Sequence, residues 1–153
     1  MSRGILLDTN LLIKAFDQDS ETSPEDRDIA REQLKALLRD DSVAFAITPL
    51  IRYEFLRHVA WGDDERLQIL LNSIQSFEAF EINSEVSDVA TALFQLDTYE
   101  AQQHNQEKNI DKRKFDAFHL AAAKCNDLEL VSDDSDVAML EPLYTRLVDA
   151  RKD

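Results

Sequence analysis

The residues of this sequence that could carry out chemistry are acids placed beside apolar segments. Asp8 ends the apolar segment ILLD, Glu54 stands among Leu, Ile and Phe residues, and Asp116 precedes the alanine-rich segment AFHLAAA. A further acidic group follows the apolar segment LELV and consists of Asp133, Asp134 and Asp136. Burying a carboxylate is costly unless it is paired, so acids in such surroundings need a partner.

A divalent cation is the partner that would reconcile several carboxylates at one place. Clustered carboxylates repel one another, which raises their pKa values unless a cation compensates. Hard ions such as Mg²⁺ prefer a cage of oxygen ligands. Water on such an ion can lose a proton and attack a phosphodiester, while the ion stabilises charge on the phosphate. The acids therefore indicate metal-dependent phosphodiester chemistry, provided that the fold brings them together.

Alternating strands and helices would bring them together. Short apolar segments predict strands at 4–8, 43–47, 77–82 and 128–132, and an edge strand at 144–149. Helical spacing of apolar residues predicts helices at 11–17 after Asn10, at 25–39, at 50–61 after Thr48 and Pro49, at 63–75, after Ser84, and at 115–126.

This order of elements predicts right-handed crossovers between parallel strands. We therefore expect residues 1–153 to form a single α/β domain with three layers, α/β/α, and a mostly parallel sheet of four to five strands. Ligand sites of such folds lie at the carboxyl ends of the strands. Asp8 and the acids after residue 132 occupy such ends, so we expect them to meet.

Composition limits the classes of protein that fit. The chain has 153 residues with 17 Lys and Arg against 31 Asp and Glu, so its net charge is −14. That balance argues against a broad basic surface for nucleic acid but allows local binding through metal ions, and it suits a basic protein partner. With one cysteine, Cys125, and no apolar run of about 20 residues, we expect a cytoplasmic protein without a membrane span.

Four motifs in order resemble PIN-domain ribonucleases, in particular the toxin subunits of bacterial VapBC-type toxin–antitoxin pairs. They are LLDTNLLI near the start, TPLIRYEFL after the second predicted strand, DAFHLAAA, and VSDDSD after the last apolar strand. The resemblance covers nearly the whole chain. It implies a PIN-like fold and an Mg²⁺- or Mn²⁺-dependent endoribonuclease that cleaves RNA, forms a homodimer and is silenced by an antitoxin protein.

The resemblance also implies roles for individual residues. The catalytic, metal-binding acids would be Asp8, Glu54, Asp116 and Asp134. The supporting residues would be Thr9 and Asn10, which would orient Asp8, Ser132 in place of a Thr, and Asp136, which would act through a bound water.

Two nearby features have more than one interpretation. Lys112, Arg113 and Lys114 form the chain's single basic triplet. They would either clamp a substrate phosphate beside the metal or form a solvated helix start. We expect His119 to pack or to contact a metal ligand rather than to be one, because the site reads as all-oxygen.

Simpler interpretations of each acid remain open. Asp8 could cap a helix, Glu54 could lie on a surface, Asp116 could interact with a helix dipole, and the acidic run could be a solvated turn. Two other functions are also conceivable. A phosphotransfer domain with Asp8 as nucleophile lacks the second Asp that phosphatases of this kind place two residues later, where Asn10 stands. A non-catalytic PIN-like scaffold would bind a partner only.

Overall fold

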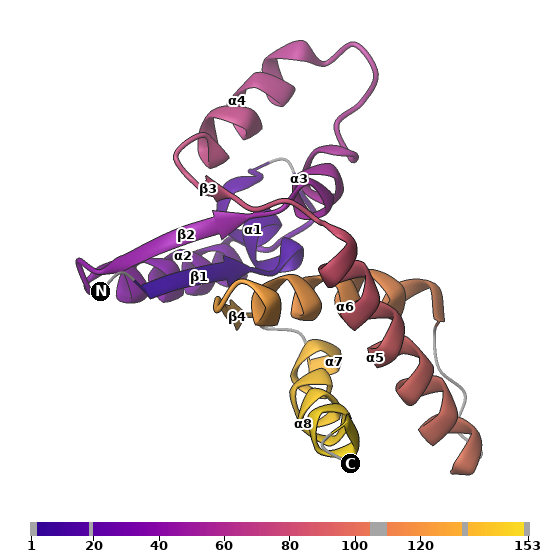
Figure 1. Ribbon diagram of the computed structural model, residues 1–153. Coiled ribbons are helices and arrows are strands. Elements are labelled where there is room, and N and C mark those ends of the chain that lie inside the picture. The colour runs from indigo at the N-terminus through magenta and orange to yellow at the C-terminus, as the bar shows by residue number, and fades with distance from the viewer. Residues whose placement is uncertain (1–2, 19, 105–109, 133–134, 152–153) are drawn as a thin grey trace.

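The computed structural model describes residues 3–18, 20–104, 110–132 and 135–151, with the backbone alone for 110–114 and 135–136. Its centre is a parallel sheet of four strands in the order β3-β2-β1-β4. The strands are β1 (Arg3–Leu7), β2 (Val43–Ile47), β3 (Glu78–Ala79) and β4 (Glu129–Val131). The helices are α1 (Thr9–Phe16), α2 (Pro24–Leu38), α3 (Pro49–Leu56), α4 (Asp64–Ile74), α5 (Ser84–Gln103), α6 (Ile110–Cys125), α7 (Ser135–Ala138) and α8 (Leu140–Arg151) (Figure 1).

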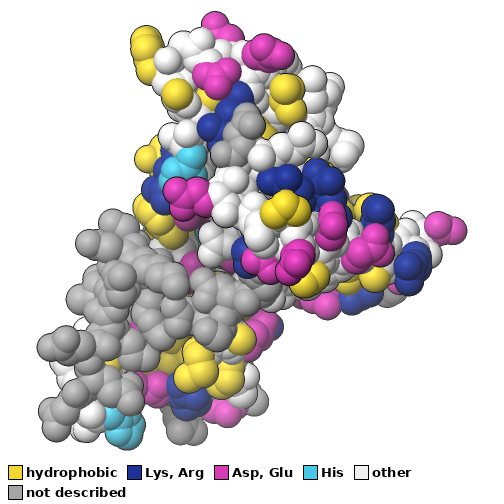
Figure 2. Space-filling model, turned by 180° about the vertical axis from the view of Figure 1, so that it is seen from behind, with side chains coloured by type: hydrophobic (Ala, Val, Ile, Leu, Met, Phe, Trp, Pro, Cys, Tyr) yellow, Lys and Arg dark blue, Asp and Glu magenta, His cyan; other side chains and the backbone are white. Residues whose placement is uncertain are grey.

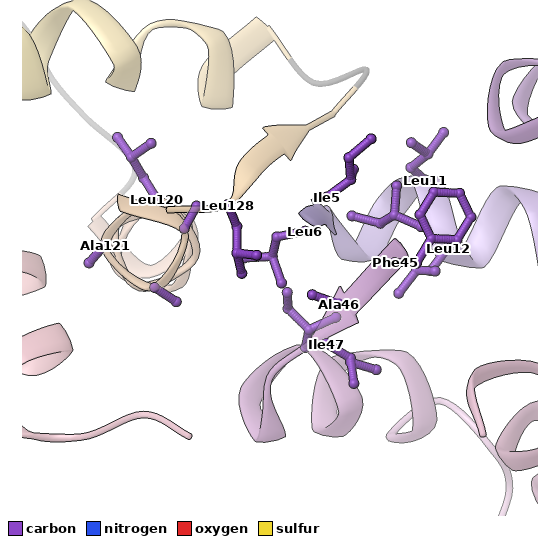
Figure 3. Packing of buried hydrophobic residues seen from close by; sticks show 14 of the residues in the cluster. Ile5, Leu6, Leu11, Leu12, Phe45, Ala46, Ile47, Leu120, Ala121 and Leu128 are labelled. Carbon is purple, nitrogen blue, oxygen red and sulfur yellow. The ribbon is translucent and has the colours of Figure 1, made fainter. Parts of the chain in front are cut away.

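The apolar strand β1 lies between β2 and β4 and is buried on both faces. Figure 3 shows Ile5 and Phe45 on the side of α1, while Leu6 lies on the side of Leu128 and helix α6. Side chains of a strand alternate between its two faces, so one apolar strand can support a helix layer on each side. The predicted three-layer α/β/α arrangement with a mostly parallel sheet is therefore confirmed.

At the start of β1, Gly4 packs closely against the Leu128 side chain. A methyl group on Gly4 would collide with the Leu128 side chain, so the absence of a side chain at this position lets Leu128 cover the strand. Leu128 lies directly before β4 and belongs to the buried core. The two strands that carry the candidate site are thus held close together.

Several expected boundaries differ from the structure. The strand predicted at 77–82 is reduced to Glu78–Ala79, which pairs with the end of β2. Helix α1 begins at Thr9 rather than after Asn10. Helix α5 is capped by Asn83 rather than Ser84, because the Asn83 side chain accepts a hydrogen bond of 3.1 Å from the Val86 N–H.

The edge strand predicted at 144–149 is wrong, because these residues belong to helix α8. Its buried residues are Leu140, Leu143 and Leu147. That spacing of three and four residues is the period of a helix and not of a strand. Helix α8 packs against α5 and α6 (Figure 1).

None of the helices in the described ranges is both long enough and apolar enough to cross a membrane.

Candidate functional site

Asp8 lies where β1 ends, beside the end of β4. Its backbone N–H donates a hydrogen bond of 2.9 Å to the Val131 carbonyl, which extends the pairing of the two strands. Its side chain is only 3% exposed, and its Oδ2 accepts a hydrogen bond of 2.9 Å from the Ser132 hydroxyl. Although Asp8 occupies the N-cap position of α1, its side chain makes no capping hydrogen bond. Helix capping therefore does not explain this buried carboxylate.

Glu54 reaches the same end of the sheet from helix α3. That helix starts directly after β2, where the Thr48 hydroxyl accepts a hydrogen bond of 3.2 Å from the Ile51 N–H. The Glu54 side chain is 14% exposed. Its Oε1 accepts a hydrogen bond of 3.1 Å from the Thr9 hydroxyl. The Thr9 hydroxyl thus contacts Glu54, and its expected role in orienting Asp8 stays a prediction.

The imidazole of His119 is the second partner of Glu54. Its Nε2 lies 2.5 Å from Glu54 Oε1. Burial acts to raise the pKa of Glu54, but the interaction with His119 and the hydrogen bond from Thr9 lower it by more. The net effect is a Glu54 pKa below its ordinary value, which favours the ionised carboxylate.

Asp116 and His119 come from one face of helix α6, three residues apart. Asp116 is 9% exposed and His119 is 2% exposed. Asp8, Asp116 and His119 each have a possible ligand atom, and these atoms all lie within 4.8 Å of one another. Two carboxylates and an imidazole at such distances are chemically suited to a divalent metal ion. Glu54 is joined to this group through His119.

Several of the other expected site residues lie wholly or partly outside the described ranges. Asp134 lies outside the described residues, as do the side chains of Lys112, Arg113, Lys114 and Asp136. The backbone places the basic triplet near the start of α6 and Asp136 in α7. Ser132 contacts Asp8, as described above, and Asn10 is exposed.

His119 was expected to pack or to contact a metal ligand, and the structure places its buried ring against Glu54. Its spacing of three residues from Asp116 in DAFHLAAA puts both side chains on one helical face. That signal was available, but the distance to Glu54 was not, because 65 residues separate the two in the sequence.

A cavity of about 670 Å³ has Asn10 in its lining, which among the described residues contains neither Asp8, Asp116 nor His119. Its lining includes basic and acidic side chains, among them Lys14, Asp17, His58 and Arg66. Figure 2 shows a similar mixture on the face drawn there, where Lys and Arg side chains are interspersed with Asp and Glu. On this face, within the described part of the chain, basic groups are dispersed. A broad phosphate-binding patch is therefore not the means by which this face would hold nucleic acid.

Comparison with known proteins identifies the family. Solved structures with the same fold include VapBC2 from Rickettsia felis bound to a DNA fragment from their promoter, with 15% identity, a TM-score of 0.58 and coverage of 86% of this chain and 87% of that one. They also include a toxin–antitoxin complex from Klebsiella pneumoniae, at 21% identity, TM-score 0.56 and the same two coverages, 86% and 87%. A third is FitAcB from Neisseria gonorrhoeae, at 18% identity and TM-score 0.58, covering 89% of this chain and 91% of that one.

Among curated proteins, none has a sequence that matches this chain significantly. The family model of the PIN domain matches residues 5–141, which is most of the sequence. The chain therefore belongs to the PIN domain family.

Proposed function

We propose that this chain is a divalent-metal-dependent endoribonuclease and the toxin of a toxin–antitoxin pair. One observation carries the proposal. Asp8, Glu54 and Asp116 come from three separate segments and meet at the carboxyl end of the sheet. The possible ligand atoms of Asp8, Asp116 and His119 lie within 4.8 Å of one another, and His119 contacts Glu54. Residues 1–153 would form one nuclease domain.

Asp8 and Asp116 would hold the metal ion, Mg²⁺ or Mn²⁺, because their carboxylates are the buried oxygens of the site. A bound ion of this kind supplies an activated water and stabilises charge on the phosphate. Ser132 orients the Asp8 carboxylate through its hydrogen bond. Asp134 remains a proposed fourth acid, and Asp136 a proposed supporting residue, by the resemblance of VSDDSD to the family.

Two side chains hold Glu54 in place. Thr9 donates to it from the start of α1, and His119 contacts it from α6. Its pKa lies below the ordinary value, so the carboxylate is ionised at neutral pH. An ionised, fixed carboxylate can bind a cation or accept a proton without first being reorganised.

The substrate we propose is RNA, bound next to the metal ion rather than across a basic surface. The cavity beside Asn10 offers a path for the strand, with Lys14 and His58 among its lining residues. Lys112, Arg113 and Lys114 would clamp a phosphate beside the metal ion. Such local contacts suit a chain whose net charge is −14.

An antitoxin protein is the partner we propose, and a homodimer the assembly. The similar solved structures are complexes of this class, one of them bound to promoter DNA. The strong negative charge of the chain favours a basic antitoxin segment. Action on RNA inside the cell would place the protein in the cytoplasm.

Cleavage of labelled single-stranded and structured RNA by the purified chain tests the proposal. We expect cleavage with Mg²⁺ or Mn²⁺, none with a chelator, and none from Asp8→Asn or Asp116→Asn. Asp28→Asn removes an exposed acid on α2 and should leave cleavage unchanged. Full activity in either site variant would refute the assignment. Failure of the native chain both to bind Mn²⁺ in isothermal titration and to cleave RNA would instead favour the non-catalytic scaffold.

A further inference from the structure

His119 has one ring nitrogen whose role is not explained by the contacts described above. Its side chain is 2% exposed, so neither nitrogen is open to bulk solvent. Nε2 contacts Glu54 Oε1. Nδ1 is buried and has no hydrogen-bond partner among the described residues. A buried polar atom without a partner costs about 1–3 kcal/mol, so its presence calls for an explanation.

The contact with Glu54 occupies one of the two ring nitrogens of His119. Glu54 Oε1 contacts Nε2, so Nδ1 is the ring nitrogen left for another partner. In a neutral imidazole, a proton on Nε2 leaves Nδ1 with a free lone pair. When Nε2 donates to Glu54, Nδ1 is therefore able to act as a ligand.

Metal-binding histidines commonly have this arrangement. The nitrogen that does not bind the metal donates its N–H to a carboxylate, which orients the ring and increases the basicity of the ligand nitrogen. Here Glu54 is that carboxylate, and it is itself held by Thr9. The possible ligand atoms of His119, Asp8 and Asp116 all lie within 4.8 Å of one another.

We propose that His119 is a nitrogen ligand of the metal ion held by Asp8 and Asp116, and that Glu54 orients its imidazole. This inference rests on the proposed metal-dependent function. It replaces the all-oxygen site expected from the sequence by a mixed oxygen and nitrogen site. Imidazole favours first-row transition metals, whereas Mg²⁺ prefers oxygen. The site should therefore discriminate in favour of Mn²⁺ over Mg²⁺.

A simpler role for His119 is to position Glu54 without contacting the metal. That role accounts for Nε2 but leaves Nδ1 buried and without a partner in the described part of the chain. The two roles differ in whether a histidine nitrogen is bonded to the ion, which spectroscopy can detect directly.

Pulsed electron paramagnetic resonance of the Mn²⁺-loaded full chain tests the ligand role. We expect nitrogen coupling to the bound Mn²⁺ that changes when the protein is made with isotopically labelled histidine, a test that needs no substitution. The coupling should disappear in His119→Ala. It should persist in His58→Ala and His104→Ala, the matched controls, because both of these histidines are exposed.

Titration calorimetry adds a second measurement. Loss of the nitrogen ligand in His119→Ala should weaken Mn²⁺ binding by at least about tenfold and Mg²⁺ binding by less. Equal losses for both ions, or no histidine coupling in the native chain, would overturn the ligand role. If Mn²⁺ still binds and Asp8→Asn abolishes that binding, the proposed function stands without this inference. Absence of Mn²⁺ binding by the native chain would remove both.

Discussion

The substitution Asp116→Asn should stabilise the metal-free protein while it abolishes cleavage. Asp8 and Asp116 are both at least nine-tenths buried, and their possible ligand atoms lie within 4.8 Å. Two unit charges at that distance repel by about 3.5 kcal/mol at an effective dielectric constant of about 20. Nearby water and hydrogen bonds reduce this value, so we expect a gain in unfolding free energy of about 1–3 kcal/mol.

Thermal unfolding in the presence of a chelator measures the gain. For a domain of this size, about 1–3 kcal/mol corresponds to a rise in Tm of roughly 2–12 °C for Asp116→Asn. Saturating Mn²⁺ should reduce the difference in Tm between Asp116→Asn and the native chain. At about 100 times its Kd the ion stabilises the native chain by about 2.7 kcal/mol, so the native Tm should rise while that of the variant does not.

Two outcomes would contradict the expected repulsion and the expected metal binding at Asp116. If Asp116→Asn melts below the native chain without metal, repulsion between the two acids does not contribute significantly to the free energy of unfolding. If Mn²⁺ raises both Tm values equally, the ion does not bind at Asp116. The control is Asp28→Asn, which removes an exposed charge on α2 and should change the unfolding free energy by no more than about 0.5 kcal/mol.

Two other contacts give testable expectations. Because the Glu54 pKa is lowered from its ordinary value of 4.5, its contacts stabilise the fold above that pH, and this stability is lost as the pH falls through the folded value. Thr9→Val should cost about 1–3 kcal/mol near neutral pH. The difference from the native chain should shrink as the pH falls through the folded value, as measured by urea unfolding; a cost that does not depend on pH would contradict the assignment. Arg66 pairs with Asp17 at 2.6 Å, with side chains 19% and 4% exposed, so Arg66→Met should cost roughly 2–4 kcal/mol in the same assay. Lys35→Met breaks an exposed pair instead and should cost less than about 1 kcal/mol; similar losses for both would show that burial does not matter here.

Local sequence patterns were sufficient for most of the fold. The strand over 43–47 was predicted with its observed bounds, and Thr48 followed by Pro49 marked the start of α3. These features depend on neighbouring residues, through the alternation of apolar side chains and the chemistry of helix caps. The segment 144–149 was wrongly predicted to be a strand. Its apolar spacing is ambiguous over six residues and becomes helical only when Leu140 and Leu143 are included.

The acids of the candidate site could be named from the sequence, but their mutual contacts could not. Asp8 and Asp116 were recognised because apolar neighbours predict burial and the order of elements predicts a common edge of the sheet. By itself, the sequence determined the α/β class, the family resemblance and which acids to propose for the site. Only the tertiary structure brought Glu54 within reach of Thr9 and His119, across separations of 45 and 65 residues. Such contacts depend on how α1, α3 and α6 pack around the sheet, and no local pattern encodes that packing.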